Sequence, residues 1–163
     1  PEQVEDLKLK EQTLETAPDS IGSTFTYQFD GKRFLLAEDN EINAMIVVEL
    51  LARRGAAVDR AENGQAVVDR FRSMPVGTYD AILMDIQMPV LNGWGAAEQI
   101  RDLEREDAAA IPIIALSAND YTEDVERSRK AGMNGHVGKP IDLNVLKAQL
   151  AAATAEAAYR GNE

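Results

Sequence analysis

From Arg33 onward, short apolar runs alternate with longer stretches of helical period, and this alternation constrains the fold more than any other feature. Parallel strands need helical crossovers to connect them, so the pattern is typical of a parallel sheet covered by helices. Three runs are unbroken apolar segments, as central strands require, and the other two are weaker, as expected at the edges of a sheet. The predicted strands are 34–37, 57–60, 81–84, 113–116 and 135–137.

Between these strands, apolar residues fall on one stripe of each helical segment, which predicts that the stripes face the sheet. Asn40 is placed to cap the first helix. The segment 121–131 is the least apolar, so we expect a marginal helix there, and a last helix is expected over about 143–159. The stripes are Ile42, Met45, Ile46 and Leu50, then Val67, Val68 and Phe71, then Ala97, Ile100 and Leu103, and finally Leu146, Leu150 and Ala153.

The chain divides into three predicted parts. Residues 33–153 are expected to form one doubly wound α/β domain with a five-stranded parallel sheet. Residues 1–32 are expected to be an N-terminal extension or linker, in which Phe25, Tyr27 and Phe29 alternate with polar residues as in a strand with one buried face. Residues 154–163 are the expected C-terminal tail of the last helix.

Composition excludes several classes of function. With 17 basic and 28 acidic residues the net charge is −11, which argues against binding to nucleic acid or to an anionic membrane surface. Without Cys and with a single His, the chain lacks thiolate and imidazole metal clusters and cysteine nucleophiles. No apolar run is long enough to span a membrane and no signal peptide is visible, so we expect a cytoplasmic location.

Acidic residues follow the predicted strands at the edge where ligands bind in open parallel sheets. Glu38 and Asp39 follow the first strand, and Asp85 follows the third. Clustered carboxylates repel one another unless a cation lies among them, and oxygen ligands without imidazole or thiolate suit Mg²⁺. The sequence therefore predicts a magnesium site.

Ser117 and Lys139 come directly after the fourth and fifth strands, at the same predicted edge. A carboxylate can attack a phosphoryl group and form an aspartyl phosphate when a metal and an ammonium group neutralise the phosphoryl oxygens. Asp85, at the end of the most central strand, is the predicted nucleophile. Lys139 would pair with the phosphoryl oxygens, and the Ser117 hydroxyl would hydrogen-bond the phosphate.

Four motifs that contain these residues resemble those of receiver domains of two-component phosphorelay systems, in the form found in hybrid histidine kinases and response regulators. They are LLAEDNEIN (35–43), LMDIQMPVLNGW (83–94), IIALSAN (113–119) and AGMNGHVGKPI (131–141). The resemblance runs from Arg33 to about Ala153. It implies a flavodoxin-like fold with strand order 2-1-3-4-5 and an N-terminal extension.

The resemblance also implies how the acceptor and the metal are held. Asp85 is similar to the phospho-accepting aspartate of the family, and Glu38 and Asp39 match the acidic pair that holds Mg²⁺. The backbone carbonyl of Gln87 would be a further metal ligand.

Three more positions follow from the resemblance. Ser117 matches the hydroxyl residue that turns toward the phosphate, and Lys139 matches the lysine that pairs with it, with a cis peptide often found before Pro140. His136 stands where the family commonly has a switch aromatic residue. Its charge would make the switch sensitive to pH.

A receiver would take a phosphoryl group from a phosphohistidine of a histidine kinase onto Asp85, and would catalyse its own modification rather than turn over a substrate. The conformational change would be read by a partner protein, or the group would be relayed to a histidine phosphotransfer domain. A GSTF motif at 22–25 resembles the last strand of a kinase ATP-binding domain, so residues 1–32 are interpreted as a possible remnant of that domain in a hybrid kinase.

Three alternatives use the same residues differently. A magnesium-dependent phosphohydrolase with an aspartyl nucleophile would need an acid two residues after Asp85, where Gln87 stands. A flavin-binding electron carrier would need a phosphate-cradling loop after the first strand, and the acidic residues at 38–41 would repel the phosphate. A non-enzymatic interaction module stays open, although every residue that phosphorylation requires is present.

Overall fold

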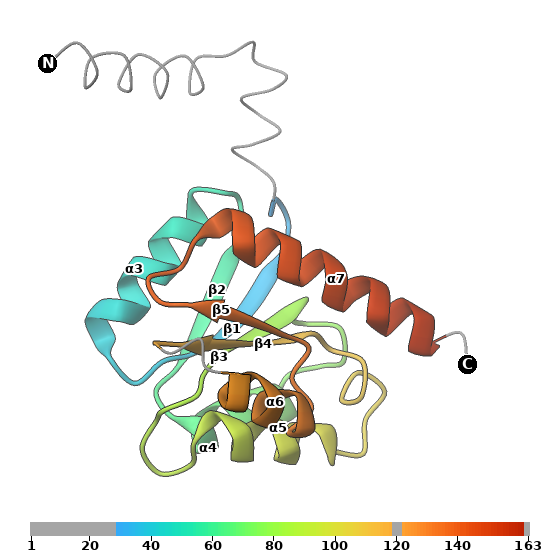
Figure 1. Cartoon of the computed structure of the whole chain (residues 1–163). Helices are drawn as coiled ribbons and strands as arrows, with labels where there is room; N and C mark the ends of the chain where they lie inside the picture. The colour runs from blue at the N-terminus through green and yellow to red at the C-terminus, as the bar shows by residue number, and fades with distance from the viewer. Residues whose placement is uncertain (1–28, 119–121, 162–163) are drawn as a thin grey trace, which may run out of the picture.

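In the computed structural model, residues 29–118 and 122–161 are described, and five strands alternate with five helices along them (Figure 1). Each strand lies within one residue of its predicted range. The predicted strand around Phe25 and Tyr27 lies outside the described residues. The elements are β1 (Arg33–Ala37), α3 (Glu41–Ala52), β2 (Ala57–Ala61), α4 (Gly64–Ser73), β3 (Ala81–Asp85), α5 (Gly93–Arg101), β4 (Ile113–Ser117), α6 (Thr122–Lys130), β5 (Gly135–Gly138) and α7 (Leu143–Gly161).

The five strands form one parallel sheet in the order β2-β1-β3-β4-β5. This confirms the flavodoxin-like order implied by the family resemblance. Strands β3 and β4 are buried along their whole length, and β1 is buried after its first residue, whereas the edge strands β2 and β5 are mostly half-buried. The apolar runs are therefore central strands covered on both faces.

Helices cover both faces of the sheet. In Figure 1, α3 and α7 lie on one side and α4, α5 and α6 on the other. Because successive strand residues point to opposite faces, the three central strands β1, β3 and β4 each contribute side chains to two separate cores. The predicted stripes of α4 and α7 are confirmed, and so are Ala97 and Ile100 of α5, whereas Leu103 lies beyond the end of that helix and is partly buried. On the α4 and α5 side the strands contribute Leu35, Ile82 and Ile113, and on the α3 and α7 side they contribute Leu36, Leu83 and Ile114.

The predicted stripe of α3 is wrong. Ile42, Met45 and Ile46 are 69%, 64% and 53% exposed instead of facing the sheet. Apolar residues lie on more than one side of this helix, so the helical period alone allows more than one buried face. The three residues that face the sheet are Ala44, Val47 and Leu51.

The segment before β1 packs against the amino ends of the strands. Phe29 is buried against Phe34 in an edge-to-face ring pair with centroids 5.7 Å apart, and its amide donates to the carbonyl of Arg54 at 3.1 Å. Phe29 and Thr154 line the same groove of about 410 Å³, which also contains residues that begin β1 and β3. The chain therefore enters the domain at the amino ends of the strands, and α7 passes beside the same groove.

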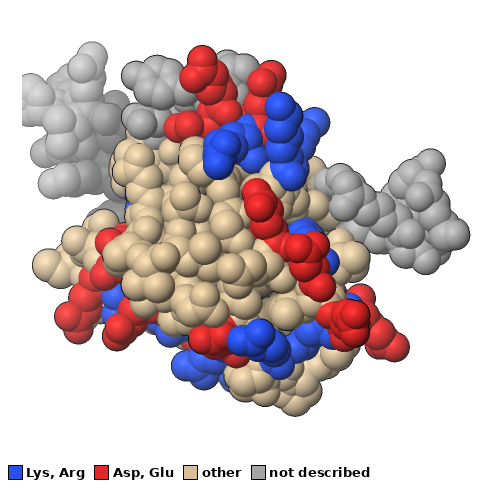
Figure 2. Space-filling model, turned by 90° about the horizontal axis from the view of Figure 1, so that it is seen from below, with Lys and Arg blue, Asp and Glu red and all other residues tan. Residues whose placement is uncertain are grey.

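The surface is acidic overall but mixed in sign where Figure 2 shows it. On this face, on the side of α4, α5 and α6, basic side chains lie beside acidic ones around a largely uncharged middle.

Among the described residues, no helix combines the length and the apolar character needed to cross a membrane.

The loop from β3 to α5 contains a strained residue. Val90 has a φ of 72°, and among the described residues it is the one non-glycine position with positive φ. The amide of Leu91 donates to the carbonyl of Pro89 at 2.8 Å, which closes a three-residue turn about Val90. This φ is that of the rare form of the γ-turn and is unfavourable for a β-branched residue. Since the Val90 side chain is 81% exposed, packing does not offset the strain.

Replacing Val90 with Asn should stabilise the protein by about 0.5–1 kcal/mol, because Asn tolerates positive φ far better than a β-branched residue does. The measurement is urea unfolding of the wild type and Val90→Asn. The matched control is Val76→Asn, since Val76 is also an exposed loop valine but lacks a positive φ. Equal midpoints for both variants would show that the Val90 turn stores no strain.

Candidate functional site

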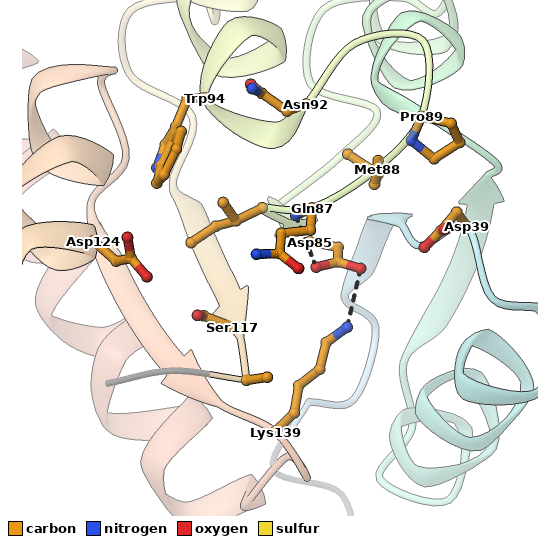
Figure 3. Close-up of a pocket in the computed structure, with 12 residues that line it drawn as sticks. Asp39, Asp85, Gln87, Met88, Pro89, Asn92, Trp94, Ser117, Asp124 and Lys139 are labelled. Carbon is orange, nitrogen blue, oxygen red and sulfur yellow. Dashed lines mark hydrogen bonds and ion pairs between the residues drawn. The ribbon is translucent and has the colours of Figure 1, made fainter. Parts of the chain in front are cut away.

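The carboxyl ends of β1, β3, β4 and β5 meet around a cleft of about 520 Å³ (Figure 3). The cleft lies where the strand order reverses between β1 and β3, the place at which open parallel sheets bind ligands. Its lining combines most of the predicted site residues, Glu38 and His136 excepted, with others that the sequence did not single out. The residues that line it are Asp39, Asp85, Ile86, Gln87, Met88, Pro89, Asn92, Trp94, Ser117, Ala118, Asp124 and Lys139.

Three carboxylates converge at this edge. One oxygen from each of Glu38, Asp39 and Asp85 lies within 4.8 Å of the others. Glu38 is only 2% exposed and Asp85 only 6% exposed, whereas Asp39 is open to solvent. Two negative groups are thus held inside the protein with a third at its surface.

Lys139 lies between the two buried carboxylates. Its Nζ is 3.0 Å from Oδ2 of Asp85 and 3.1 Å from Oε2 of Glu38. Figure 3 shows its side chain extending from the end of β5 toward Asp85. The peptide bond between Lys139 and Pro140 is cis, as the family resemblance implied.

Backbone contacts fix the position of Asp85 at the end of β3. The amide of Gln87 donates to Oδ1 of Asp85 at 3.3 Å, and the amide of Gly93 donates to the carbonyl of Ile86 at 2.8 Å. Gly93 packs so closely on the Asp85 carbonyl that a Cβ atom there would overlap it. The first turn of α5 is therefore locked against the strand that carries the central carboxylate.

The buried charges shift one another's protonation. Burial raises the pKa of Asp85 to about 7; the adjacent Glu38 adds to the rise and Lys139 opposes it. Burial alone would raise the pKa of Glu38, but hydrogen bonds with Asp85 and Lys139 outweigh it and hold that pKa below its usual value. Burial would lower the pKa of Lys139, but its contacts with Asp85 and Glu38 raise it. Near neutral pH, Glu38 and Lys139 are charged while Asp85 readily takes a proton.

The donor set fits a hard divalent cation. The three carboxylates supply only oxygen ligands, and a cation among them would displace the proton that Asp85 otherwise holds. The exposed carboxylate of Asp39 gives a cation access from solvent. Mg²⁺ prefers such a site because it keeps several of its own waters and takes few protein oxygens.

The structure brings Ser117 and Gln87 to this cleft but not His136. Ser117 is the last residue of β4 and is 7% exposed, and Gln87 lies in the loop after β3. His136 lies in β5, in a different pocket of about 260 Å³ that Arg129 and Gln149 also line. Its backbone amide donates to Oε1 of Gln149 at 3.2 Å. Ser117 and His136, the two predicted switch residues, thus lie in two different pockets.

Sequence reasoning missed the link between the cleft and α6. Trp94 of α5 lines the cleft, and its indole Nε1 donates to Oγ of Ser128 at 2.9 Å. The guanidinium of Arg127 lies over the Trp94 ring, 4.5 Å from its centroid. The sequence indicates only that Trp94 begins a helix, and no periodicity reveals partners more than thirty residues away. Asp124 of α6 completes this wall of the cleft.

Without metal, the stability advantage of Asp85→Asn over the wild type should grow as pH rises from 5 to 7. Asp85 has a pKa of about 7 in the folded protein, against its usual 3.8 in the unfolded chain. Protonation of Asp85 therefore stabilises the folded state fully below pH 3.8, and this stabilisation is lost as pH rises toward 7. The lowered pKa of Glu38 acts below 4.5, and the raised pKa of Lys139 acts above 10.5, so neither changes in this window. The difference should approach about 1.4 kcal/mol per pH unit.

Urea unfolding in chelator at several pH values measures this difference. Asp124→Asn removes an acid from the same cleft but not from the carboxylate cluster, so its unfolding should follow the wild type across the range. A constant difference between Asp85→Asn and the wild type would contradict the raised pKa. Mg²⁺ should restore wild-type stability at pH 7, because it binds the folded carboxylates.

Comparison with known sequences identifies a family and several relatives. The response regulator receiver domain family matches residues 34–151. Hybrid signal transduction histidine kinase I of Dictyostelium discoideum is 37% identical over 117 residues, which are 71% of this chain and 7% of that protein. Two-component system protein A of Emericella nidulans is 38% identical over 130 residues, 79% of this chain and 18% of that protein. The chain thus spans less than a fifth of either relative.

Two solved structures are similar to this chain in both sequence and fold. The receiver domain of sensor histidine kinase PA1611 from Pseudomonas aeruginosa is 35% identical, with a TM-score of 0.67 over 77% of this chain and 98% of that one. It holds a magnesium ion coordinated in its active site cleft. The receiver domain of Ssk1 from Saccharomyces cerevisiae is 32% identical, with a TM-score of 0.66 over 77% of this chain and 91% of that one. It was solved with the histidine phosphotransfer protein Ypd1.

Proposed function

We propose that this chain, which belongs to the response regulator receiver domain family, takes a phosphoryl group from a phosphohistidine onto Asp85. The observation that carries the proposal is the buried Asp85 carboxylate with Lys139 Nζ at 3.0 Å and two further carboxylates beside it. A nucleophile, a cation for the phosphoryl oxygens and a set of metal ligands thus lie in one cleft. In this proposal the chain catalyses its own modification more than it turns over a substrate.

In the transfer, an oxygen of Asp85 forms a bond to phosphorus while the bond from phosphorus to the donor histidine nitrogen breaks. The donor imidazole leaves with the electron pair of that bond and is neutral once it carries a proton. Lys139 shifts its contact from the carboxylate to the phosphoryl oxygens, and the Ser117 hydroxyl donates a hydrogen bond to one of them. Both residues line the cleft around Asp85.

Magnesium is the proposed cofactor, and when bound it neutralises charge that develops on the phosphoryl oxygens. The related PA1611 receiver, which contains magnesium in its cleft, supports this assignment. The proposed ligands are Glu38, Asp39, Asp85 and the backbone carbonyl of Gln87.

Phosphorylation is proposed to shift the domain between two states. The phosphate draws Ser117 inward, His136 takes the space that this opens, and α6 moves with them. Trp94 supports the part played by α6, because it lines the cleft and hydrogen-bonds Ser128 of that helix.

The proposed domain division is the one that the sequence predicts: an extension over 1–32, the receiver over 33–153 and a tail over 154–163. The family match to residues 34–151 agrees with the middle part. Because the relatives include hybrid histidine kinases that are far longer than this chain, we propose that the receiver works within such a kinase.

Acetyl phosphate and Mg²⁺ should add a single phosphoryl group to the wild type and none to Asp85→Asn, because the amide cannot act as the nucleophile. Intact mass measures the adduct, which should be stable in acid and labile in base. Asp124→Asn is the matched control, since it removes an acid from the same cleft outside the carboxylate cluster. Chelation of Mg²⁺ should prevent the reaction, and an unmodified wild type at saturating Mg²⁺ would favour an interaction module that is not phosphorylated.

The exposed apolar side of α3 supports a histidine phosphotransfer domain as the partner. Ile42, Met45 and Ile46 project from this helix, which begins directly after the acidic residues of the cleft. Ile46 also lines an apolar groove of about 360 Å³ to which Lys139 contributes. A partner docked on α3 would therefore present its histidine beside Lys139 and Asp85. The complex of the related Ssk1 receiver with Ypd1 favours this class of partner.

Met45→Glu should slow phosphoryl transfer from phosphorylated Ypd1, used as a probe donor, by about tenfold, because a buried charge at an interface centre is costly. Transfer from acetyl phosphate, which needs no docking surface, should change by less than about twofold. Val76→Glu is the control, since Val76 is exposed in the loop between α4 and β3. Equal losses with both donors, or none with Ypd1, would contradict docking on α3.

A further inference from the structure

Arg60 of β2 binds the loop that carries two of the three carboxylates. Its Nε donates to the backbone carbonyl of Glu38 at 3.0 Å, and its Nη2 donates to the backbone carbonyl of Asp39 at 3.1 Å. One guanidinium therefore bridges two consecutive peptide groups from the neighbouring strand. The paired N–H donors on one side of a guanidinium, here called the fork, match such a pair of acceptors, whereas the donors of an ammonium group all lie on one nitrogen.

Two further contacts hold the same loop. The amide of Glu38 donates to the carbonyl of Ala61 at 3.1 Å, which extends the pairing of β1 with β2. Oδ1 of Asn40 accepts from the amide of Asn43 at 2.9 Å and caps α3, as predicted from the sequence. The loop is thus fixed at both ends by its amide and its cap, and Arg60 fixes the two carbonyls between them.

The choice of atoms matters for the chemistry of the cluster. Lys139 contacts Glu38 through its carboxylate oxygens, so it competes with a cation for them. Arg60 contacts only carbonyl oxygens of this loop, so the carboxylates keep their lone pairs. Arg60 can therefore hold the ligands in place without occupying a ligand atom.

We propose that Arg60 is a positioning residue for the divalent cation site: it fixes the backbone of Glu38 and Asp39 so that their carboxylates meet a cation together with Asp85. The proposal rests on the magnesium site of the proposed function. Pre-positioned ligands lose less freedom when the cation binds, so the fork should raise cation affinity.

The charge of Arg60 acts in the opposite direction, because a guanidinium near the site repels a cation. Positioning and repulsion predict different results for two substitutions. Arg60→Met removes both the fork and the charge, whereas Arg60→Lys removes the fork and keeps the charge. If positioning dominates, both variants bind Mg²⁺ more weakly; if repulsion dominates, Arg60→Met binds it more tightly and Arg60→Lys is unchanged.

The experiment is a Mg²⁺ titration of the full chain without a phosphoryl donor. Trp94 is the one tryptophan in the sequence and lines the cleft, so its fluorescence reports binding, and calorimetry provides the second readout. We expect about tenfold weaker binding for both Arg60 variants, at the low end of the losses seen when outer contacts of metal ligands are removed. Arg53→Met is the control for net charge, since Arg53 pairs with Glu49 on the surface of α3.

Thermal unfolding of the metal-free variants separates positioning from a general loss of structure. Arg60→Lys keeps the aliphatic stem and the charge, so it should unfold near the wild type while binding Mg²⁺ more weakly. Unchanged affinity in both variants, or tighter binding by Arg60→Met, overturns the proposal.

The same titration distinguishes this proposal from the proposed function. A wild type that binds Mg²⁺ but forms no phosphoryl adduct contradicts the phosphorylation of Asp85 and leaves the role of Arg60 standing. A wild type that binds no Mg²⁺ overturns both.

Discussion

The site depends on one interaction, the contact of the Lys139 ammonium with two buried carboxylates, Glu38 and Asp85. Two buried acids at this spacing would repel each other strongly, and burial of either charge without a partner would be costly. The ammonium reduces that cost, and it comes from a residue 101 positions away from Glu38. The ends of β1, β3 and β5 must therefore meet correctly before these charges are stabilised, which ties the site to the completed sheet.

The negative charges at this edge of the sheet outnumber the positive charge that contacts them. Three carboxylates lie around one ammonium that contacts two of them, and burial first, then repulsion from Glu38, raises the pKa of Asp85. A bound cation or proton relieves this repulsion. The metal-free protein is therefore less stable, and the site binds a cation more tightly, a trade common at functional sites. Close packing keeps the groups from moving apart, since Gly93 abuts the Asp85 carbonyl and Arg60 holds the loop of Glu38 and Asp39.

Two kinds of feature could be predicted from the sequence: the strands, which follow from local apolar patterns, and the site residues that the parallel topology brings to one edge of the sheet. Strand ranges followed from apolar runs, and Asp85, Glu38 and Lys139 met because parallel strands all end on the same side. The buried side of α3 was predicted wrongly because apolar residues occur on several sides of that helix. Arg60 and Trp94 were missed for another reason: their partners are set by side-chain reach across neighbouring elements, which no spacing along the chain encodes.

The groove that Phe29 and Thr154 line has a consequence for architecture. Both lie in a groove at the amino ends of the strands, while the acidic cleft lies at the carboxyl ends. The chain therefore enters the domain at the end opposite the cleft, whereas α7 continues past this groove to Gly161. An entry at that end leaves the carboxyl ends of the strands, and with them the acidic cleft, clear of the point where the chain joins the domain.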